Sequence, residues 1–445
     1  MNDLEAARLI AEKADSLGGK VYFVGGCVRD EVMGIKNKDI DIEIHGLSRE
    51  QVEKILDSVG ERLEYGKNFG IYGLRGLDLD IALPQKKSSG NGSVTAVPFM
   101  GTYNSAKRRD FTMNALMKNV LTDEMIDHFG GLDDIRSKVV RHIDYETFVE
   151  DPLRVLRATQ FSARFGFGIA AETVSLCRNI DISALAAERI MLELEKALMR
   201  SERPSVFFEQ LRRMGQLDYW FSEVKALINV PQNRVYHLEG DAWTHTMMVL
   251  DEAAKRRDTV RYPLGFMISA LCHDFGKAIS TTVSEDGTVH SYEHETQGLP
   301  LVKRFLERLT TQTKLLEYVL NMTELHMEPN TMAKARSKLK KTNKLFDSAV
   351  EPFDLIQLAV CDGLGKLPKC DDTEEFLMQR YGRFVEIMER PYLMGRDLID
   401  AGMKPSQDFA EILAYAHKLR LAGLDKDNQL RQSLAYARSV LKIKG

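Results

Sequence analysis

The stretch VYFVGGCVRDEVMGIKNKDIDIEI, residues 21–44, decides the fold of the first part of this 445-residue chain. An apolar, β-prone run ends in the two glycines at 25 and 26, and a second run alternates acidic residues with isoleucines over 39–44. Because successive side chains on a strand point to opposite faces, this period of two places the three acids on one face and the isoleucines in a core. We therefore expect a strand, a glycine turn, a helix and a second strand.

Asp39 and Asp41 would stand about 7 Å apart along that second strand and could hold one or two Mg²⁺ ions. Such ions can bind the oxygens of a triphosphate and activate a 3′-hydroxyl for in-line attack. Glycines without a Cβ let backbone N–H groups approach phosphates closely. Either motif alone also fits an exposed strand face and a simple turn, but their order together resembles the nucleotidyltransferase superfamily that includes DNA polymerase β.

The flanking segments complete the expected sheet domain. Residues 3–16 have helical spacing, and FGIYGLRGLDLDIALP, residues 69–84, predicts a strand pair with Asp78 and Asp80 on one face. The segment 84–107 is rich in Gly, Ser, Asn and Pro, and we interpret it as a long mobile loop. Beyond about residue 140 the pattern is helical almost throughout.

Composition sets limits on location and partners. No run approaches the roughly 20 apolar residues that span a bilayer, and the amino terminus has no signal-peptide pattern, so we expect a cytoplasmic protein without a membrane partner. The net charge of −4 requires any nucleic acid to bind a local basic surface. The five cysteines lack C-x-x-C spacing and are expected to be free thiols, at positions 27, 177, 272, 361 and 370.

A second group of chemistry-bearing residues lies later in the chain. Six of the ten histidines fall within residues 237–326, in the order H…HD…H…H, and an aspartate follows them. Imidazoles with carboxylates suit a transition metal that lowers the pKa of bound water. A single histidine is more often structural, but this order resembles the HD superfamily of metal-dependent phosphohydrolases.

Nearly the whole chain resembles the bacterial class II CCA-adding enzymes, the tRNA nucleotidyltransferases of the poly(A) polymerase family, in the subtype with an HD phosphohydrolase domain. The motifs that carry the resemblance are VYFVGGCVRDEVMG (21–34), DID (39–41), RRDFTMNAL (108–116), DHFGGLDDI (127–135), EDPLRVLRATQFSARF (150–165), ERIMLELEKAL (188–198), WTHTMMVLD (243–251), LCHDFGKA (271–278) and LMGRDLIDAGMKP (393–405).

The resemblance implies an α+β chain: a DNA polymerase β-like nucleotidyltransferase palm with helices on one side of a mixed sheet, followed by helical parts. The expected domains are the palm (1–140), a neck that recognises the nucleotide base (141–225), an HD-type body (226–375) and a helical tail (376–445).

The resemblance also implies a catalytic and nucleotide-binding site. Asp39 and Asp41 match the Mg²⁺-binding carboxylates, and Asp80 sits where a third acid would lie. Asp151 and Arg154 match the pair that bonds the Watson–Crick edge of CTP or ATP in place of a template. The remaining implied contacts are Gly25, Gly26 and Arg29 to triphosphate, Asp30, Arg108, Asn114 and Glu150 in the nucleotide site, Arg109 and Asp110 to ribose, and Arg157 to phosphate.

In the HD-like part, the resemblance implies a second metal site and activity on 2′,3′-cyclic phosphates or phosphomonoesters. The metal would be Ni²⁺, Co²⁺, Mn²⁺ or Zn²⁺. The implied ligands are His245, His273, Asp274, His294, His326 and Asp362.

Several functions share these motifs. The leading interpretation is addition of C, C and A to tRNA from CTP and ATP, with the basic segments 334–344 and 436–445 as candidates for contact with tRNA phosphates. Poly(A) polymerases and the enzymes that add only CC or only A have the same head motifs. An alternative of another class is a phosphohydrolase or tRNA-binding protein with an inactive head. The oligomeric state is not indicated by the sequence.

Overall fold

The computed structural model describes residues 1–36, 39–65, 70–87, 94–233, 235, 237–369 and 373–439, and the chain folds into two units. The first unit comprises Met1–Leu185 and Arg213–Gln216, and the second comprises Ala186–Arg212 and Leu217–Gly445. The division after Leu185 falls inside the segment predicted as a neck, 141–225, so the four-part division stays a prediction.

A seven-stranded sheet forms the centre of the first unit. Its strand order is β3-β4-β5-β2-β1-β8-β9, and β2 and β5 are parallel while the other neighbours are antiparallel, so the sheet is mixed as predicted. The strands are β1 Lys20–Val24, β2 Ile40–His45, β3 Arg62–Glu64, β4 Ile71–Leu74, β5 Leu79–Ala82, β8 Met117–Asn119 and β9 Met125–Ile126.

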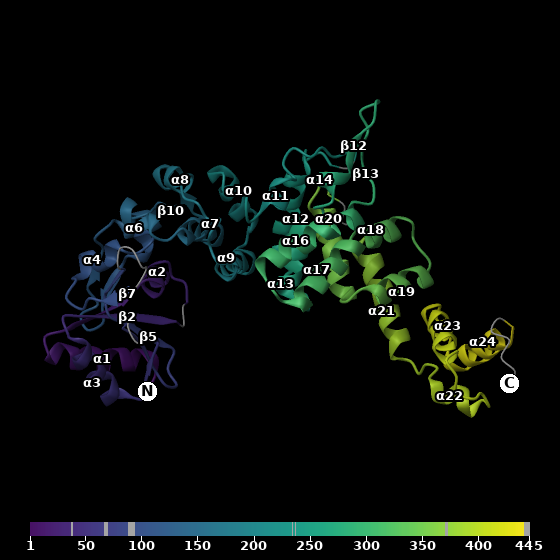
Figure 1. Ribbon diagram of the computed structural model, residues 1–445, viewed down its shortest axis with the longest axis horizontal. Helices are drawn as coiled ribbons and strands as arrows, with labels where there is room; N and C mark the ends of the chain where they lie inside the picture. Colours follow the sequence, from purple (N-terminus) through teal and green to yellow (C-terminus); the bar gives the residue numbers. More distant parts are fainter. Residues whose placement is uncertain are drawn as a thin grey trace. The chain divides into compact units, whose positions relative to one another are not determined.

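Helices cover both faces of this sheet, which corrects the expectation of helices on one side. On one face α1 (Asp3–Ser16) and α3 (Arg49–Val59) lie side by side and bury Ile42 and Ile81 (Figure 1). On the other face Ala106 of α4 (Thr102–Lys107) packs on Val24. Because side chains on a strand alternate, the odd-numbered residues of β1 point to one of these apolar layers and the even-numbered residues point to the other.

Helices of the first unit begin and end at recognisable capping residues. Asn2 and Glu5 form a capping box at the start of α1, and α7 (Leu153–Phe165) ends at Gly166 with φ +66°. The other helices of this unit are α2 Gly26–Val32, the 3-10 turn η1 Thr112–Asn114, α5 Gly131–Arg136, α6 Tyr145–Val149 and α8 Ala171–Cys177, with a short parallel pair β10 Val139–Val140 and β11 Gly168–Ile169.

The segment 84–107 is not the irregular loop that its composition predicts. Its described residues form an antiparallel hairpin, β6 (Gln85–Lys87) and β7 (Val94–Ala96), and then α4. Residues 88–93 lie outside the described part of the chain. The β-branched Val94 and Thr95 favour a strand, which the surrounding Gly and Ser residues obscure in the sequence.

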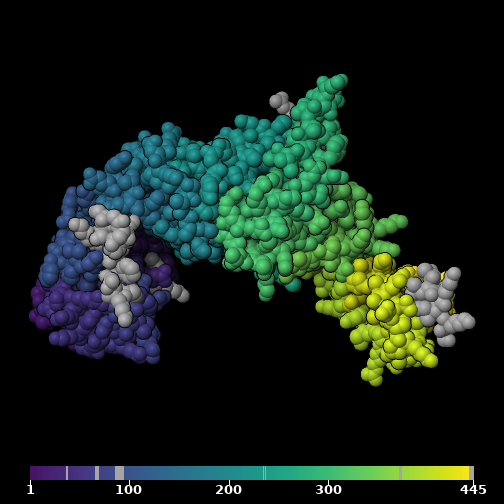
Figure 2. Space-filling model, viewed as in Figure 1, coloured from purple at the N-terminus to yellow at the C-terminus, as the bar shows by residue number. Residues whose placement is uncertain are grey.

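The second unit is almost entirely helical, as predicted. A hairpin of β12 (Thr281–Val283) and β13 (Val289–Ser291) projects from its helices (Figures 1 and 2). The remaining helices are α9 Ala187–Arg200, α10 Ser205–Met214, α11 Ser222–Lys225, α12 Ala242–Arg256, α13 Pro263–Cys272, α14 Lys277–Ser280, α15 His294–Gln297, α16 Leu299–Leu309, α17 Thr313–Leu325, α18 Met327–Lys334, α19 Leu339–Ser348, α20 Pro352–Leu364, α21 Glu374–Glu389, α22 Gly395–Asp400, α23 Phe409–Leu421 and α24 Lys426–Ser439.

Two composition-based expectations can be compared with the described residues. Four cysteines, at 27, 177, 272 and 361, are free as expected, and Cys370 lies outside the described residues. Within the described ranges, the helices all fall short of the length and apolar character that crossing a membrane requires.

Candidate active site

The three predicted catalytic acids come together on two neighbouring strands. Asp41 on β2 lies opposite Asp80 on β5 in the parallel register, and Asp39 immediately precedes β2. The isoleucines between the acids, Ile40 and Ile42, pack into the core on the other face. The alternation therefore places Asp41 and Asp80 at one side of the sheet, with Asp39 at the start of β2.

The electrostatics of Asp41 fit a divalent cation. Burial raises the pKa of Asp41, and the charges of Asp80 and Asp39 raise it further, while Arg109 opposes the shift. Clustered carboxylates repel one another, and a bound cation relieves that repulsion. Their oxygens are the ligands that Mg²⁺ prefers, so the donor set suits that ion.

The backbone conformation at position 25 favours glycine. Gly25 has φ +71° at the start of α2, a conformation that other residues adopt only with strain. A Cβ atom there would also stand 2.9 Å from Nη1 of Arg109 and 3.7 Å from Oδ2 of Asp41. The turn thus allows Arg109 to lie beside the catalytic strand.

A buried ladder of polar side chains runs behind this turn, joining Arg29, Asp30, Asn114, Asp110 and Arg157. Arg29 donates from Nε and Nη2 to Oδ1 of Asp30, at 2.8 and 2.6 Å, and from Nη1 to Oδ1 of Asn114 at 2.6 Å. Asn114 donates from Nδ2 to Oδ1 of Asp110 at 2.9 Å, and Arg157 donates from Nε to Oδ2 of Asp110 at 2.7 Å. The ladder ties α2, η1 and α7 together.

This ladder changes the interpretation of Arg29. Its side chain is buried at 4% exposure, and its guanidinium also stacks on Phe161 and Phe165, at 5.2 and 4.8 Å from the ring centroids. Buried charges need such complete pairing, because an unpaired one is costly. The contacts support an internal positioning role for Arg29 and Asp30, and the triphosphate contact stays a prediction.

The predicted base-reading pair lines a cavity of about 540 Å³. Arg154 donates from Nη1 to the carbonyl of Thr147 and from Nη2 to the carbonyl of Arg108, both at 2.6 Å, while Oδ1 of Asp151 accepts from the N–H of Leu153 at 3.2 Å. This cavity is lined both by predicted site residues and by residues that were not predicted. Its charged and polar lining comprises Glu43, Gln85, Ser105, Arg108, Arg109, Glu150, Asp151 and Arg154.

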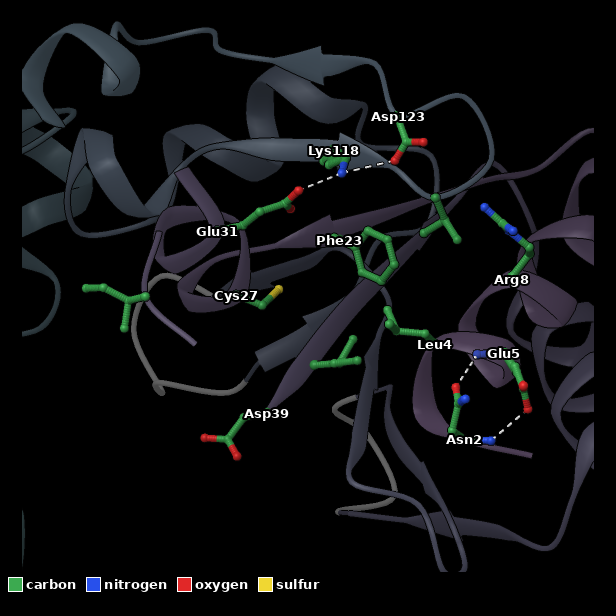
Figure 3. Close-up of a pocket in the computed structure, with 13 residues that line it drawn as sticks. Asn2, Leu4, Glu5, Arg8, Phe23, Cys27, Glu31, Asp39, Lys118 and Asp123 are labelled. Atoms are coloured by element: carbon green, nitrogen blue, oxygen red, sulfur yellow. Dashed lines mark hydrogen bonds and ion pairs between the residues drawn. The ribbon is translucent and has the colours of Figure 1, made fainter. Parts of the chain in front are cut away.

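Another cavity of the same unit holds only one predicted acid. It has a volume of about 620 Å³, and Figure 3 shows Asp39 apart from the group that Lys118 forms with Glu31 and Asp123, at 2.8 and 3.0 Å. Phe23 and Cys27 also line it. Burial raises the pKa of the Cys27 thiol, so that side chain stays protonated.

In the second unit, the predicted metal ligands converge on Asp274. Its Oδ2 lies 3.5 and 3.2 Å from Nε2 of His245 and His273, and its Oδ1 lies 3.2 and 3.8 Å from Nε2 of His294 and His326. Asp362 joins the first group, with its Oδ1 3.1 Å from Nε2 of His245. All six predicted ligands are therefore in one buried cluster.

Contacts at the Nδ1 atoms of three of these histidines orient their imidazole rings. Nδ1 of His273, His294 and His326 lies 2.9, 2.8 and 2.6 Å from the carbonyls of Ala270, Ser291 and Thr323. Such bonds hold the other ring nitrogen toward a metal. Burial and the charges of His273 and His294 lower the pKa of His326 to about 3, which keeps it neutral and able to ligate.

Comparison with known proteins shows the family of this chain. Residues 21–141 match the model of the Poly A polymerase head domain family. The chain is also 33% identical over 340 residues to the Multifunctional CCA protein of Actinobacillus pleuropneumoniae serotype 5b, which covers 73% of this chain and 80% of that protein. The chain belongs to the bacterial CCA-adding enzyme family.

Solved structures of CCA-adding enzymes share its fold. The Thermotoga maritima enzyme complexed with tRNA_CCA matches with a TM-score of 0.67 at 20% identity, covering 97% of this chain and 94% of that one. The Bacillus stearothermophilus enzyme in complex with CTP matches with a TM-score of 0.67 at 20% identity, covering 99% of both chains. At these identities the likeness concerns the fold alone.

In this member of the CCA-adding family, several residues in contact with the predicted sites were not predicted as site residues. Glu43 and His45 continue the alternation of Asp39 and Asp41, which was the available signal, and Ser105 carried none. In the second unit, Oε1 of Glu239 lies 2.7 Å from Nδ1 of His237 and 3.2 Å from Nδ1 of His245. Lys277 also joins this cluster through an ion pair, with its Nζ 2.7 Å from Oδ2 of Asp274.

We predict that Asp110→Asn weakens the first unit by about 3 kcal/mol, because Arg157 and Asn114 lose their shared anion. Burial raises the pKa of Asp110, but Arg157 and Asn114 outweigh it and hold that pKa below its usual value. The stabilisation is present above about pH 3.9, the pKa of an unfolded aspartate, and is lost as the pH falls through the lower folded value. The difference between wild type and variant should therefore shrink under acid conditions.

Hydrogen exchange of α7 peptides in urea measures this stability. Both tryptophans, Trp220 and Trp243, lie in the second unit, so their fluorescence does not report on the ladder. Asp133→Asn, at an exposed acid of α5, is the matched control. Equal protection of α7 in wild type and Asp110→Asn would contradict the structural role of the ladder.

Proposed function

We propose that this protein adds C, C and A in turn to the 3′ end of tRNA, using CTP and ATP. The observation that carries the proposal is the cavity in which Asp151 and Arg154 face Arg108 and Arg109, beside the strand that carries Asp41. The similarity to proteins described as CCA-adding enzymes supports it.

The reaction joins the tRNA 3′-oxygen to the α-phosphorus of the nucleotide. A new P–O bond forms, the bond between the α-phosphorus and the bridging oxygen breaks, and pyrophosphate leaves. Mg²⁺ held by Asp39 and Asp41, with Asp80 close by, would activate the 3′-hydroxyl and neutralise charge on the phosphates. The positive side chains of Arg108 and Arg109 would orient the nucleotide.

Base selection follows from the geometry of Arg154. Two of its N–H groups are occupied by the carbonyls of Thr147 and Arg108, which fixes the guanidinium plane and leaves other donors available. Cytosine and adenine both present an amino donor beside a ring-nitrogen acceptor, which match the carboxylate of Asp151 and a donor of Arg154. Uracil and guanine present the reverse pattern, so polar groups of the site would be left unpaired.

Contact with tRNA would use exposed lysines of the second unit. Lys338, Lys340, Lys341 and Lys344 are exposed at and within α19, in the basic segment predicted from the sequence. Such residues position a nucleic acid through its phosphates without reading its sequence. The other predicted segment, 436–445, is described only as far as Ser439.

Incorporation into three tRNA transcripts, ending at the discriminator base, at C and at CC, tests the proposal. With CTP and ATP supplied, we expect ordered addition that stops at CCA. Asp39→Ala combined with Asp41→Ala should abolish it, because the metal ligands are lost, whereas Asp57→Asn on α3 should not. Addition of CC alone, A alone or long A tails would select one of the related activities, and no incorporation would favour a protein with an inactive head.

A second activity, metal-dependent hydrolysis of phosphoesters, is proposed for the Asp274 cluster. The facing Nε2 atoms of His245 and His273, at 3.4 Å, and of His294 and His326, at 3.3 Å, form two ligand groups that share Asp274. A transition metal bound there would supply hydroxide near neutral pH. The adjoining cavity of about 200 Å³ is lined by Lys277 and Lys366, whose charges suit a phosphate.

We predict that His273→Ala abolishes Ni²⁺- or Co²⁺-dependent hydrolysis of a 2′,3′-cyclic nucleotide while CTP incorporation survives, because the ligands belong to different units. His290→Ala, on β13 and outside the cluster, is the matched control and should keep both activities. Loss of both activities in His273→Ala, measured on folded protein, would contradict two separate sites.

A further inference from the structure

Glu43 is a buried acid on the catalytic strand without a role in the proposed reaction. It occupies the next position after Asp41 on the same face of β2, and its residue exposure is only 6%. It also lines the 540 Å³ cavity together with Arg109 and Ser105. A buried carboxylate this close to a nucleotide site is costly unless it is paired.

Three side chains pair with Glu43. Ser105 of α4 donates from Oγ to Oε1 at 2.7 Å, Nε2 of His45 lies 2.6 Å from the same oxygen, and Nη2 of Arg109 lies 3.6 Å from Oε2. These contacts turn Oε1 toward Ser105 and His45 and leave Oε2 toward the guanidinium. Glu43 therefore forms an ion pair with Arg109.

Arg109 stands between two carboxylates of one strand. One end of its guanidinium pairs with Glu43, while Nη1 lies against the Gly25 turn, where Asp41 is the neighbouring acid. Without the charge of Glu43, Asp41 would become the main carboxylate partner of Arg109.

We infer that Glu43, supported by Ser105 and His45, is a positioning residue that holds Arg109 away from Asp41. In that position Arg109 lines the nucleotide cavity, and the side-chain oxygens of Asp41 stay available to a cation. This inference rests on the proposed function, because it assumes that the cavity takes a nucleoside triphosphate. Glu43, the next residue after Asp41 on this face, would thus have a role other than metal binding.

A double-mutant cycle on CTP binding tests the inference. Calorimetry on wild type, Glu43→Gln, Arg109→Gln and the double variant measures affinity without turnover. We expect Glu43→Gln to weaken CTP binding about tenfold, within the range of coupled neighbours, and to add nothing once Arg109 is already Gln. Glu50→Gln, at an exposed acid of α3, is the matched control and should bind CTP as wild type does.

Either of two results would overturn the inference: wild-type CTP affinity in Glu43→Gln, or additive losses in the double variant. If Glu43→Gln fails to fold, Ser105→Ala takes its place in the cycle, since it removes the hydrogen bond and leaves the charge. Ser105→Ala alone is then expected to weaken CTP binding about threefold, and to weaken it no further in a chain that already carries Arg109→Gln. Additive losses would again contradict the inference. Wild-type protein that binds no CTP would contradict the proposed function itself.

Discussion

The buried ladder from Asp30 through Arg29, Asn114 and Asp110 to Arg157 is the interaction on which the first unit depends. Each member completes the hydrogen bonding of the next, and an unpaired member would leave a charge or an amide in a nonpolar environment. Because the members come from α2, η1 and α7, the ladder fixes the glycine turn, the RRD segment and α7 relative to one another. The side chains predicted to bind the nucleotide are thus held on a rigid frame.

Repulsion between carboxylates is the second constraint. Asp39, Asp41 and Asp80 are gathered where burial and their own charges oppose ionisation of Asp41. A divalent cation satisfies that cluster, and an arginine would compete for it. Arg109 lies between Asp41 and Glu43, so a cationic side chain stands beside the predicted metal ligands while it pairs with another acid. In the proposed reaction, selection of the nucleotide and activation of the hydroxyl would use separate charges.

The sequence predicted those parts of the fold and site that depend on local periodicity. The two-residue alternation predicted β2 and the face on which Asp41 lies, and the helical spacing over residues 3–16 predicted α1 with its observed ends. The spaced histidines predicted a ligand cluster that the structure brings together around Asp274.

Partnerships between distant residues could not be predicted in this way. The bond from Arg29 to Asn114, 85 positions later, is one such partnership, and the predicted triphosphate contact of Arg29 stays a prediction. The pairing of Glu43 with Ser105 likewise depends on where α4 packs. The segment 84–107 was mistaken for a loop because its Gly and Ser content hid two short strands and a helix whose partners lie within that same segment and on the sheet.

If protein side chains alone choose the base, as we propose, the preference for CTP and ATP does not need tRNA. Equilibrium binding of the four ribonucleoside triphosphates without tRNA is therefore the decisive measurement. Arg154, held by two carbonyls, and the neighbouring Asp151 predict that CTP and ATP bind at least about 100-fold more tightly than UTP and GTP, because the latter leave polar groups of the site unpaired. Equal affinity for all four nucleotides would contradict this mechanism.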